Sequence, residues 1–253
     1  MRLDNLLDAG CFISAKELAI DESKRYSGIG RLGEKTLHRT LKYLLEPDSS
    51  YHEVEFLGSV ADIKNQEGII EIQTRELDKL APKLEKFLPQ INVTIVHPVI
   101  ERKTIHYIDT YTGESLPPRK SPIRKHPHSA LPELAKLLDF IPNDNLTIFL
   151  VFINAEDIRR LHGKIRVGRK STAKIDCIPT SVNSVLVLNK TRDYIALLPK
   201  NLLSGFTAAE FERITRLKGI DAHISIKFLM KLGVLTREKG DGGAYLYSVN
   251  AEI

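Results

Sequence analysis

Apolar residues recur at helical spacing in two stretches of the N-terminal half, after a loosely organised helical lead over residues 1–30. Within residues 32–45 one helical face collects four leucines, Leu37, Leu41, Leu44 and Leu45. Residues 76–88 show the same pattern with Leu77, Leu80, Leu84, Phe87 and Leu88. The spacing predicts two amphipathic helices, each with one face turned towards a core.

Short β-branched segments between and after these helices predict strands. Three cover residues 52–57, 59–64 and 68–74, separated by Gly58 and by a turn at residues 65–68. A fourth covers Ile91–Val96 and is closed by His97-Pro98. The order helix, three strands, helix, strand predicts an α/β fold in which a mixed sheet is flanked by helices.

The middle of the chain is rich in proline. Five of the twelve prolines lie between Tyr111 and Pro132, which predicts an exposed, semi-rigid loop over residues 111–132. A helix is expected at residues 131–140. The most apolar run of the chain, Leu146–Ile153, predicts a central strand, and a further strand is expected at residues 184–189.

The last fifty residues have helix and hairpin signals of their own. Thr207 and Glu210 form a capping box that opens a helix, and Asp221 is expected to cap a second helix that ends at Leu232. Two short strands then flank a charged, glycine-rich hairpin. This order resembles a winged helix-turn-helix, so the chain divides into an α/β domain at residues 1–198, with its core at 30–100, and a winged domain at 199–253.

The second helix of that module has two distinct rows of side chains. Ile224, Phe228 and Leu232 are expected to form its core row. The separate row His223, Lys227 and Lys231 would remain available for phosphates or bases of DNA. The alternative is a winged domain that contacts proteins or mediates dimerisation.

Composition narrows the class of protein. Hydrophobic residues make up 42% and charged residues 27% of the 253 residues, as in ordinary globular proteins. No run approaches the roughly 18 apolar residues of a membrane-spanning helix, and the N-terminus lacks the apolar core of a signal peptide. Cys11 and Cys177 alone provide neither a disulfide framework nor a zinc site, so we expect a cytoplasmic protein without membrane contact.

Positive charge is concentrated in two segments. Residues 116–128 hold four Lys or Arg and residues 158–175 hold seven, both without an acid, although the net charge is only +5. Such concentration is typical of a surface that meets phosphates, and the alternative is a pair of solvated loops. The candidate contacts are Arg119, Lys120, Arg124, Lys125, Arg166, Arg169 and Lys170. His126 and His128 would also contact phosphate, whereas His38, His52, His97 and His106 lack metal-ligand spacing.

Acidic residues converge on the predicted strands. Antiparallel pairing through the turn at residues 65–68 would bring Asp62 close to Glu71, and Gln73 would share the face of Glu71. Two neighbouring carboxylates repel each other unless a cation lies between them. Hard oxygen ligands suit Mg²⁺ or Mn²⁺, which can activate water and neutralise phosphate charge.

The order of Glu34 on a helix, then Asp62, then Glu71-Ile72-Gln73, then a helix and a strand, resembles the PD-(D/E)XK nuclease superfamily over residues 33–96. The resemblance implies a restriction-endonuclease-like mixed sheet, Asp62 and Glu71 as ligands of the catalytic metal, and Glu34 as a further acidic contributor. Gln73 stands where the family usually has lysine. Lys64 or Arg75 could supply the missing cation.

These features together predict a metal-dependent nuclease that acts on duplex DNA, with Glu34, Asp62, Glu71 and Gln73 as its catalytic set and the winged domain contributing DNA binding. The alternatives are a DNA-binding regulator with a degenerate, inactive core and a winged-helix interaction module. Self-association as a homodimer stays open. Cleavage would separate the first class from the others, and salt-dependent DNA binding would separate the second from the third.

Overall fold

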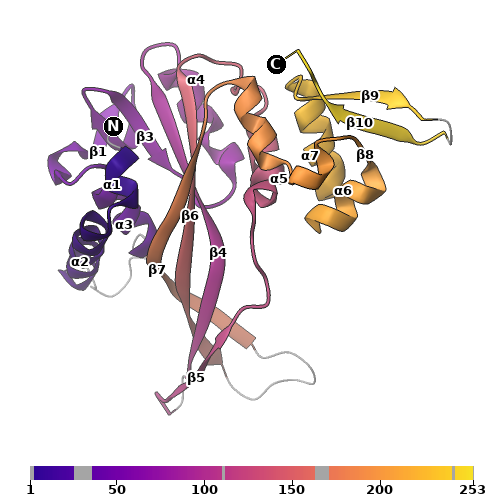
Figure 1. Cartoon of the computed structure of the whole chain (residues 1–253). Helices are drawn as coiled ribbons and strands as arrows, with labels where there is room; N and C mark the ends of the chain where they lie inside the picture. Colours follow the sequence, from indigo (N-terminus) through magenta and orange to yellow (C-terminus); the bar gives the residue numbers. More distant parts are fainter. Residues whose placement is uncertain (1–2, 26–35, 110–111, 163–170, 241–242, 253) are drawn as a thin grey trace.

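The computed structural model describes residues 3–25, 36–109, 112–162, 171–240 and 243–252. Its centre is a seven-stranded mixed sheet in the order β1-β2-β3-β4-β6-β7, with β5 paired to β4 (Figure 1). The strands are β1 (His52–Phe56), β2 (Ser59–Asn65), β3 (Gly68–Ile72), β4 (Val93–Asp109), β5 (Ser115–Lys120), β6 (Leu146–His162) and β7 (Ser171–Leu188). Pairing is antiparallel for β1–β2–β3, β4–β5 and β6–β7, and parallel for β3–β4 and β4–β6. The predicted mixed sheet is therefore confirmed.

Helices cover both faces of this sheet (Figure 1). One face packs against α1 (Leu3–Leu7), α2 (Ala9–Arg25) and α3 (Thr36–Leu45). The four leucines of α3 are buried, as their spacing predicts. The other face packs against the 3-10 helix Leu77–Leu80, α4 (Ala81–Phe87) and α5 (Leu131–Leu134). The helix expected at 131–140 is thus shorter, since α5 gives way to a 3-10 turn at Ala135–Leu137. No described helix is long and apolar enough to cross a membrane.

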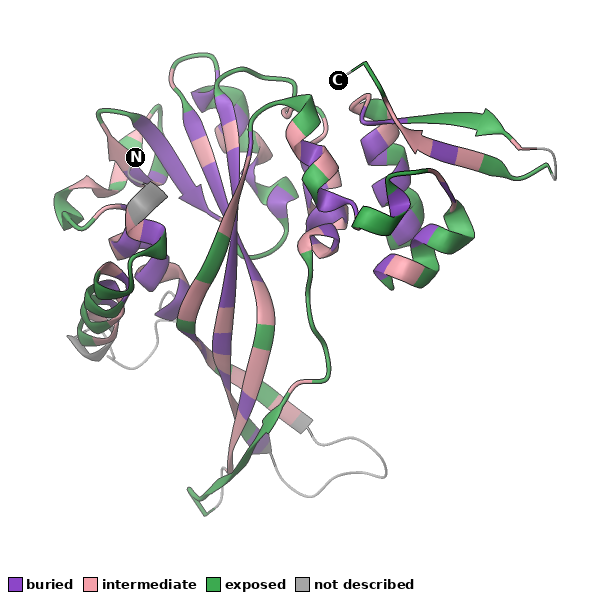
Figure 2. Ribbon diagram, in the orientation of Figure 1, coloured by how far each residue is buried: buried purple, intermediate pink, exposed green. Residues whose placement is uncertain are grey.

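Three strands are much longer than their apolar runs predict. The strand β4 does not stop at His97-Pro98 but continues to Asp109, because β6 pairs with it along its whole length. Pro98 is tolerated because β3 ends at Ile72, opposite Val96, and leaves that side of β4 open. Figure 2 shows that the far ends of β4, β6 and β7 form an arm with mixed burial, beyond the buried body of the sheet.

The segment predicted as a loop over residues 111–132 contains regular structure. The strand β5 pairs antiparallel with β4, and a 3-10 helix at Pro127–Ala130 leads into α5. All six residues of β5 are exposed, as expected for the basic segment, but the strand pairing corrects the loop assignment. The local sequence hides this pairing because Pro117 and Pro118 are unusual in a strand.

The C-terminal module contains a three-stranded sheet, β8-β10-β9, and two helices (Figure 1). Its elements are β8 (Phe206–Thr207), α6 (Ala208–Thr215), α7 (Ile220–Lys231), β9 (Leu235–Lys239) and β10 (Tyr245–Val249). The capping box of Thr207 and Glu210 is present. The helix α7 begins after Gly219, so Asp221 lies inside the helix and is not its cap.

The core row of α7 differs from the expected one. Ile224 is 36% exposed and Leu232 is only half-buried, so of the expected row only Phe228 is fully buried. The buried face consists of Ala222, Ser225, Ile226, Phe228 and Leu229. The helix is rotated because Phe228 packs edge-to-face on Tyr194, which precedes the module in sequence. One apolar cluster therefore joins the sheet, α4, α5 and the module.

Candidate functional site

The β2–β3 hairpin brings the two predicted acids together. Its register pairs Ile63 with Ile70, so Asp62 and Glu71 are the next residues along the two strands. The turn requires glycine at position 68, where φ is 145° and a Cβ would overlap the carbonyl oxygen of Asn92. The backbone amide of Ile69 donates to that carbonyl oxygen at 2.9 Å, which fixes β3 beside β4.

Glu71 is a buried carboxylate whose one cationic partner among the described residues is Lys83. Its exposed fraction is 1%, and the Lys83 ammonium on α4 donates to both carboxylate oxygens, at 2.9 and 2.7 Å. Burial raises the pKa of Glu71, the negative charge of Asp62 raises it further, and together they outweigh Lys83 and bring the pKa to about 7. The ionised form of Glu71 therefore needs a cation close to it.

The Asp62 side chain connects the hairpin backbone to α3. Its Oδ2 accepts a hydrogen bond from the Ile72 amide at 2.7 Å and lies 3.3 Å from the His38 Nε2 on α3. Burial raises the pKa of Asp62, but the His38 hydrogen bond and charge, the Ile72 amide and the Lys83 charge outweigh it and lower the pKa overall. Asp62 is thus ionised beside a second carboxylate that resists ionisation.

The other members of the predicted set are placed differently. The Gln73 amide nitrogen donates to the backbone oxygens of Arg75 and Glu76, at 2.5 and 3.3 Å, and so stabilises the turn after β3. Lys64, one of the two expected cations, lies over the Phe56 ring, 5.1 Å from its centroid. Arg75 is exposed at the end of the strand. Glu34 lies outside the described residues.

Sequence reasoning missed Lys83 and His38. Both lie on helices, and their approach to the acids depends on how each helix packs on the sheet. The only sequence signal was the position of Lys83 near the start of the amphipathic helix that follows Glu71-Ile72-Gln73. His38 was set aside because its sequence spacing to other ligands has no pattern.

A basic cavity adjoins the acidic pair. His38 lines it together with residues from the segment after β3, from β4 and β7, and from the segment after β5, among them Arg75, Lys103, Lys125 and Lys174. Lys103 and Lys174 form ion pairs with Asp157. The Asp157 carboxylate is fully buried and lies 3.5 Å from the Lys103 ammonium and 2.8 Å from the Lys174 ammonium.

Asp157 has a third cationic partner and is firmly ionised. Arg159 approaches it to 2.9 Å. Burial alone would raise the pKa of Asp157, but the hydrogen bonds from Lys174 and Arg159 and the charges of Lys174 and Lys103 lower it to about 2. Asp157 precedes the second basic segment by one residue, and its role as an anchor was not predicted.

The predicted basic contacts fall into several groups. Of the first segment, Arg119 hydrogen-bonds the Tyr107 hydroxyl at 2.8 Å, Lys120 and Arg124 are exposed, and Lys125 reaches the basic cavity. Arg166, Arg169 and Lys170 lie outside the described residues. His223, Lys227 and Lys231 are exposed on α7, as predicted, and line a groove with Arg237.

His128 is not the phosphate contact that the sequence indicated. It is 9% exposed and stacks on His126 with ring centroids 5.4 Å apart. Burial, followed by the charge of His126, lowers the pKa of His128 to about 4. A neutral, buried imidazole of this kind contributes to packing near the C-terminal module.

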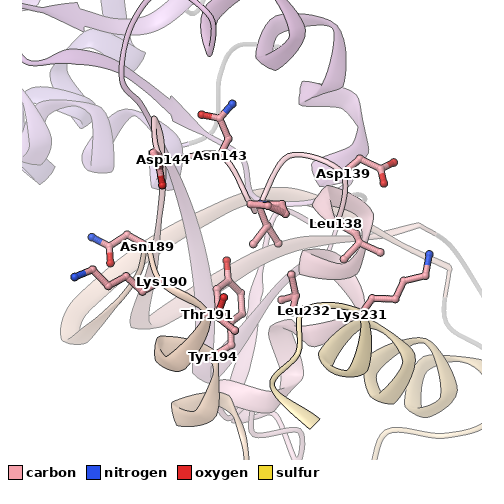
Figure 3. Close-up of a pocket in the computed structure, with 12 residues that line it drawn as sticks. Leu138, Asp139, Asn143, Asp144, Asn189, Lys190, Thr191, Tyr194, Lys231 and Leu232 are labelled. Carbon is pink, nitrogen blue, oxygen red and sulfur yellow. The ribbon is translucent and has the colours of Figure 1, made fainter. Parts of the chain in front are cut away.

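Another cavity, about 780 Å³, lies apart from the acidic pair, between the segment 138–144, the residues that follow β7 and the end of α7. Figure 3 shows Asn189 and Lys190 on one side of it and Leu232 and Lys231 on the other. None of the described residues that line it is a histidine or a cysteine. Its ionisable lining side chains are Asp139, Asp144, Lys190, Tyr194 and Lys231.

Comparison with known proteins adds a family and one relative. The model of a family described as "Domain of unknown function (DUF8091)" matches residues 35–189, which include α3, the acidic pair and the basic cavity. An uncharacterized protein of Treponema pallidum (strain Nichols) is 29% identical over 215 residues, covering 85% of this chain and 84% of that protein. No solved structure matches.

Proposed function

The chain belongs to the DUF8091 family, and we propose that it is a metal-dependent nuclease of the PD-(D/E)XK type that acts on DNA. The observation that carries the proposal is the placement of Asp62 and Glu71 on adjacent strands, with the Lys83 ammonium against Glu71 and a basic cavity alongside. The mixed sheet flanked by helices agrees with the core that the resemblance implies.

The acidic pair has the chemistry of a site for a divalent cation. Mg²⁺ is commonly held by one or two carboxylates, with water and phosphate oxygens completing its ligands, so Asp62 and Glu71 could be sufficient. Their mutual repulsion gives the pair a need for positive charge, which Lys83 meets in the structure. A bound Mg²⁺ or Mn²⁺ would activate water and neutralise charge on the phosphate.

Lys83 and His38 supply the charge and the positioning that a lysine at position 73 would provide. Lys83 carries the positive charge that Gln73 lacks, and its side chain is 29% exposed, so it can also face a phosphate oxygen. His38 hydrogen-bonds Asp62 and orients that carboxylate from the α3 side. We assign Lys83 as the electrostatic partner of the reacting phosphate and His38 as a positioning residue.

Positive surfaces outside the acidic pair support nucleic acid as the substrate. The basic cavity, the exposed Lys120 and Arg124, and the row His223, Lys227 and Lys231 are distributed over the sheet and the module. The helix-helix-hairpin order of the module favours duplex DNA over RNA, because winged helix-turn-helix domains place their second helix in the major groove. Such contacts would position the duplex over the acidic pair.

One observation favours a second candidate, a DNA-binding protein without cleavage. Both oxygens of Glu71 are already bound by Lys83, and Asp62 is already bonded to the Ile72 amide and to His38. A pair satisfied in this way is also compatible with a degenerate core that serves stability alone. Only an activity measurement separates the two candidates.

The experiment is a cleavage assay on supercoiled plasmid, labelled linear duplex, single-stranded DNA and RNA, with Mg²⁺ or Mn²⁺ and with EDTA. We expect metal-dependent cleavage of DNA that falls at least about a hundredfold in Asp62→Asn and Glu71→Gln, since metal-held charge stabilisation is worth several kcal/mol. Glu85→Gln is the matched control, because Glu85 is exposed on α4 two residues from Lys83.

Three outcomes bear on the proposal. Retained DNA binding in Asp62→Asn and Glu71→Gln, with lost cleavage, supports it. Absence of cleavage of any substrate with either metal, despite DNA binding, overturns it in favour of the non-catalytic candidate. Cleavage of RNA alone overturns the assignment of DNA.

A further inference from the structure

The cavity beside the acidic pair has an unusual charge. Its volume is about 480 Å³, and the described residues that line it include four basic side chains, Arg75, Lys103, Lys125 and Lys174, and neither aspartate nor glutamate. The buried Asp157 carboxylate beneath them compensates for part of this charge, through Lys103 and Lys174. The cavity thus carries a substantial excess of positive charge.

Arg75 and Lys125 contribute most of that excess. Within the described ranges neither side chain has a salt bridge or a side-chain hydrogen bond. The pKa of Lys125 is lowered, first by burial and then by repulsion from Lys103 and Arg75, with weaker opposition from Glu133. Groups with like charge that crowd together without a counterion are stabilised by an anion placed between them.

His38 links the cavity to the acidic pair. His38 lines the cavity and at the same time lies 3.3 Å from the Asp62 carboxylate. Arg75 follows Glu71 by four residues on the same segment of chain. An anion in the cavity would therefore lie next to whatever group meets Asp62 and Glu71.

We propose that this cavity binds a phosphate group of the nucleic-acid strand, next to the phosphate at the acidic pair. The assignment rests on the proposed function, since it treats the acidic pair as the reacting centre. Arg75 can bind phosphate oxygens with paired N–H donors, while Lys103, Lys125 and Lys174 act as point charges around them. Pro98, Ile100 and Ile123 on the same wall offer apolar surface for the attached sugar.

The phosphate has two sources with the same chemistry. It is either an internal phosphodiester or a terminal phosphomonoester, which carries more negative charge. A terminal group would select strand ends, whereas an internal one would accept a continuous strand. Binding of oligonucleotides that differ only at their ends distinguishes the two sources.

The test measures affinity in EDTA, so that no cleavage occurs, for Arg75→Gln/Lys125→Gln against the unchanged chain. The probes are one labelled oligonucleotide duplex with 5′-phosphates, with 3′-phosphates or with neither, and the same duplex sequence closed into a circle. We expect the variant to bind at least tenfold more weakly to the probes whose phosphate occupies the cavity, because hydrogen bonds to charged groups are among the strongest. The salt slope should fall by about 0.9 for each lost contact to B-DNA.

A matched variant removes the same charge elsewhere. Lys16→Gln/Lys200→Gln loses two positive charges outside the cavity, on α2 and on the 3-10 helix Lys200–Leu202, and should leave affinity within about twofold. Arg75 and Lys125 are exposed and have no ion-pair partners among the described residues, so the test variant should keep its melting temperature.

The pattern across probes identifies the source. Equal weakening for all four probes indicates an internal phosphodiester, and weakening confined to one phosphorylated end indicates a terminal phosphate. Unchanged affinity for every probe, with the control also unchanged, overturns the assignment of the cavity.

A second probe separates this proposal from the proposed function. Inorganic pyrophosphate should raise the melting temperature of the unchanged chain and raise it less in Arg75→Gln/Lys125→Gln. If pyrophosphate binds in this way but no oligonucleotide does, the cavity is an anion site and the nuclease proposal fails. If oligonucleotides bind and are cleaved but the variant behaves like its control, only the cavity assignment fails.

Discussion

Glu71 is an ionisable group in an unfavourable environment, and its energetics follow from three neighbours. Burial and the charge of Asp62 disfavour its ionised form, and Lys83 favours it. Because Lys83 is partly exposed, its charge is screened by water and only partly offsets the other two effects. Additional positive charge at the site would therefore stabilise the ionised form of Glu71.

This balance predicts a stability that depends on pH. The pKa of Glu71 is raised from 4.5 to about 7 in the folded state, so folding binds a proton between these values. The resulting contribution to the free energy of unfolding is fully present below pH 4.5 and is lost as the pH rises through about 7. At about 1.4 kcal/mol per unit, the loss is about 3 kcal/mol.

Urea denaturation of Glu71→Gln and the unchanged chain between pH 4.5 and pH 8.5 measures this effect. The variant should gain about 3 kcal/mol relative to the unchanged chain across that range. Glu85→Gln, at an exposed position, should show no such trend. A difference that stays constant with pH would mean that Glu71 titrates normally.

Asp157 represents the opposite case, a buried carboxylate with ample cationic partners. Its pKa is lowered to about 2, so its contribution to stability is present above its ordinary value and lost only as the pH falls towards 2. Asp157→Asn at pH 7 should cost about 3 kcal/mol, because three cations lose their common anion. High salt should recover part of that loss in urea denaturation. A change below about 0.5 kcal/mol would show that the network does not stabilise the fold.

The two acids could be predicted from the sequence, whereas their partners could not. Asp62 and Glu71 follow from the turn at residues 65–68 and from the two-residue period of strands, both of which are local. Lys83, His38 and Asp157 reach their partners through packing of helices or through pairing of long strands. Such contacts depend on the whole chain, and no local pattern specifies them.

At the scale of elements, apolar periodicity predicted which helices and strands exist better than it predicted how long they are. The strands β1, β2 and β3 and the buried leucines of α3 agree with the sequence pattern. The extensions of β4 and β6 have mixed burial, so their apolar pattern is weak, and it is pairing with each other, with β5 and with β7 that holds them in the sheet. The rotation of α7 follows from contact with Tyr194, which its own periodicity cannot reveal.

The exposed row of α7 gives a test of the proposed DNA contact of the C-terminal module. Lys227→Glu/Lys231→Glu places negative charge on two exposed positions, so thermal stability should change by less than about 0.5 kcal/mol. If α7 meets duplex DNA, affinity should fall well beyond the loss in Lys227→Ala/Lys231→Ala, because the reversals repel phosphates. Titration of a labelled duplex measures affinity, and sedimentation of the same variant measures oligomeric state. Unchanged affinity with an altered oligomer would instead identify α7 as a protein-contact surface.

At the scale of the molecule, one continuous apolar cluster connects the sheet with the C-terminal module. The module is therefore packed against the α/β body, even though the family match ends at residue 189, before the module begins. Positive side chains lie on the module, on β5 and in the cavity beside the acidic pair. Of these surfaces, only the cavity shares a residue, His38, with the contacts of the acidic pair.

Divalent-cation binding at the acidic pair is the central claim, and calorimetric titration with Mn²⁺ measures it directly. One Mn²⁺ should bind to the unchanged chain and to Glu85→Gln, and binding should be lost in both Asp62→Asn and Glu71→Gln. A non-cleavable duplex in the cell should tighten binding, because phosphate oxygens complete the ligands of such ions. Absence of Mn²⁺ binding with and without the duplex, or equal binding by all four proteins, would contradict the assignment of Asp62 and Glu71 as a metal-dependent centre.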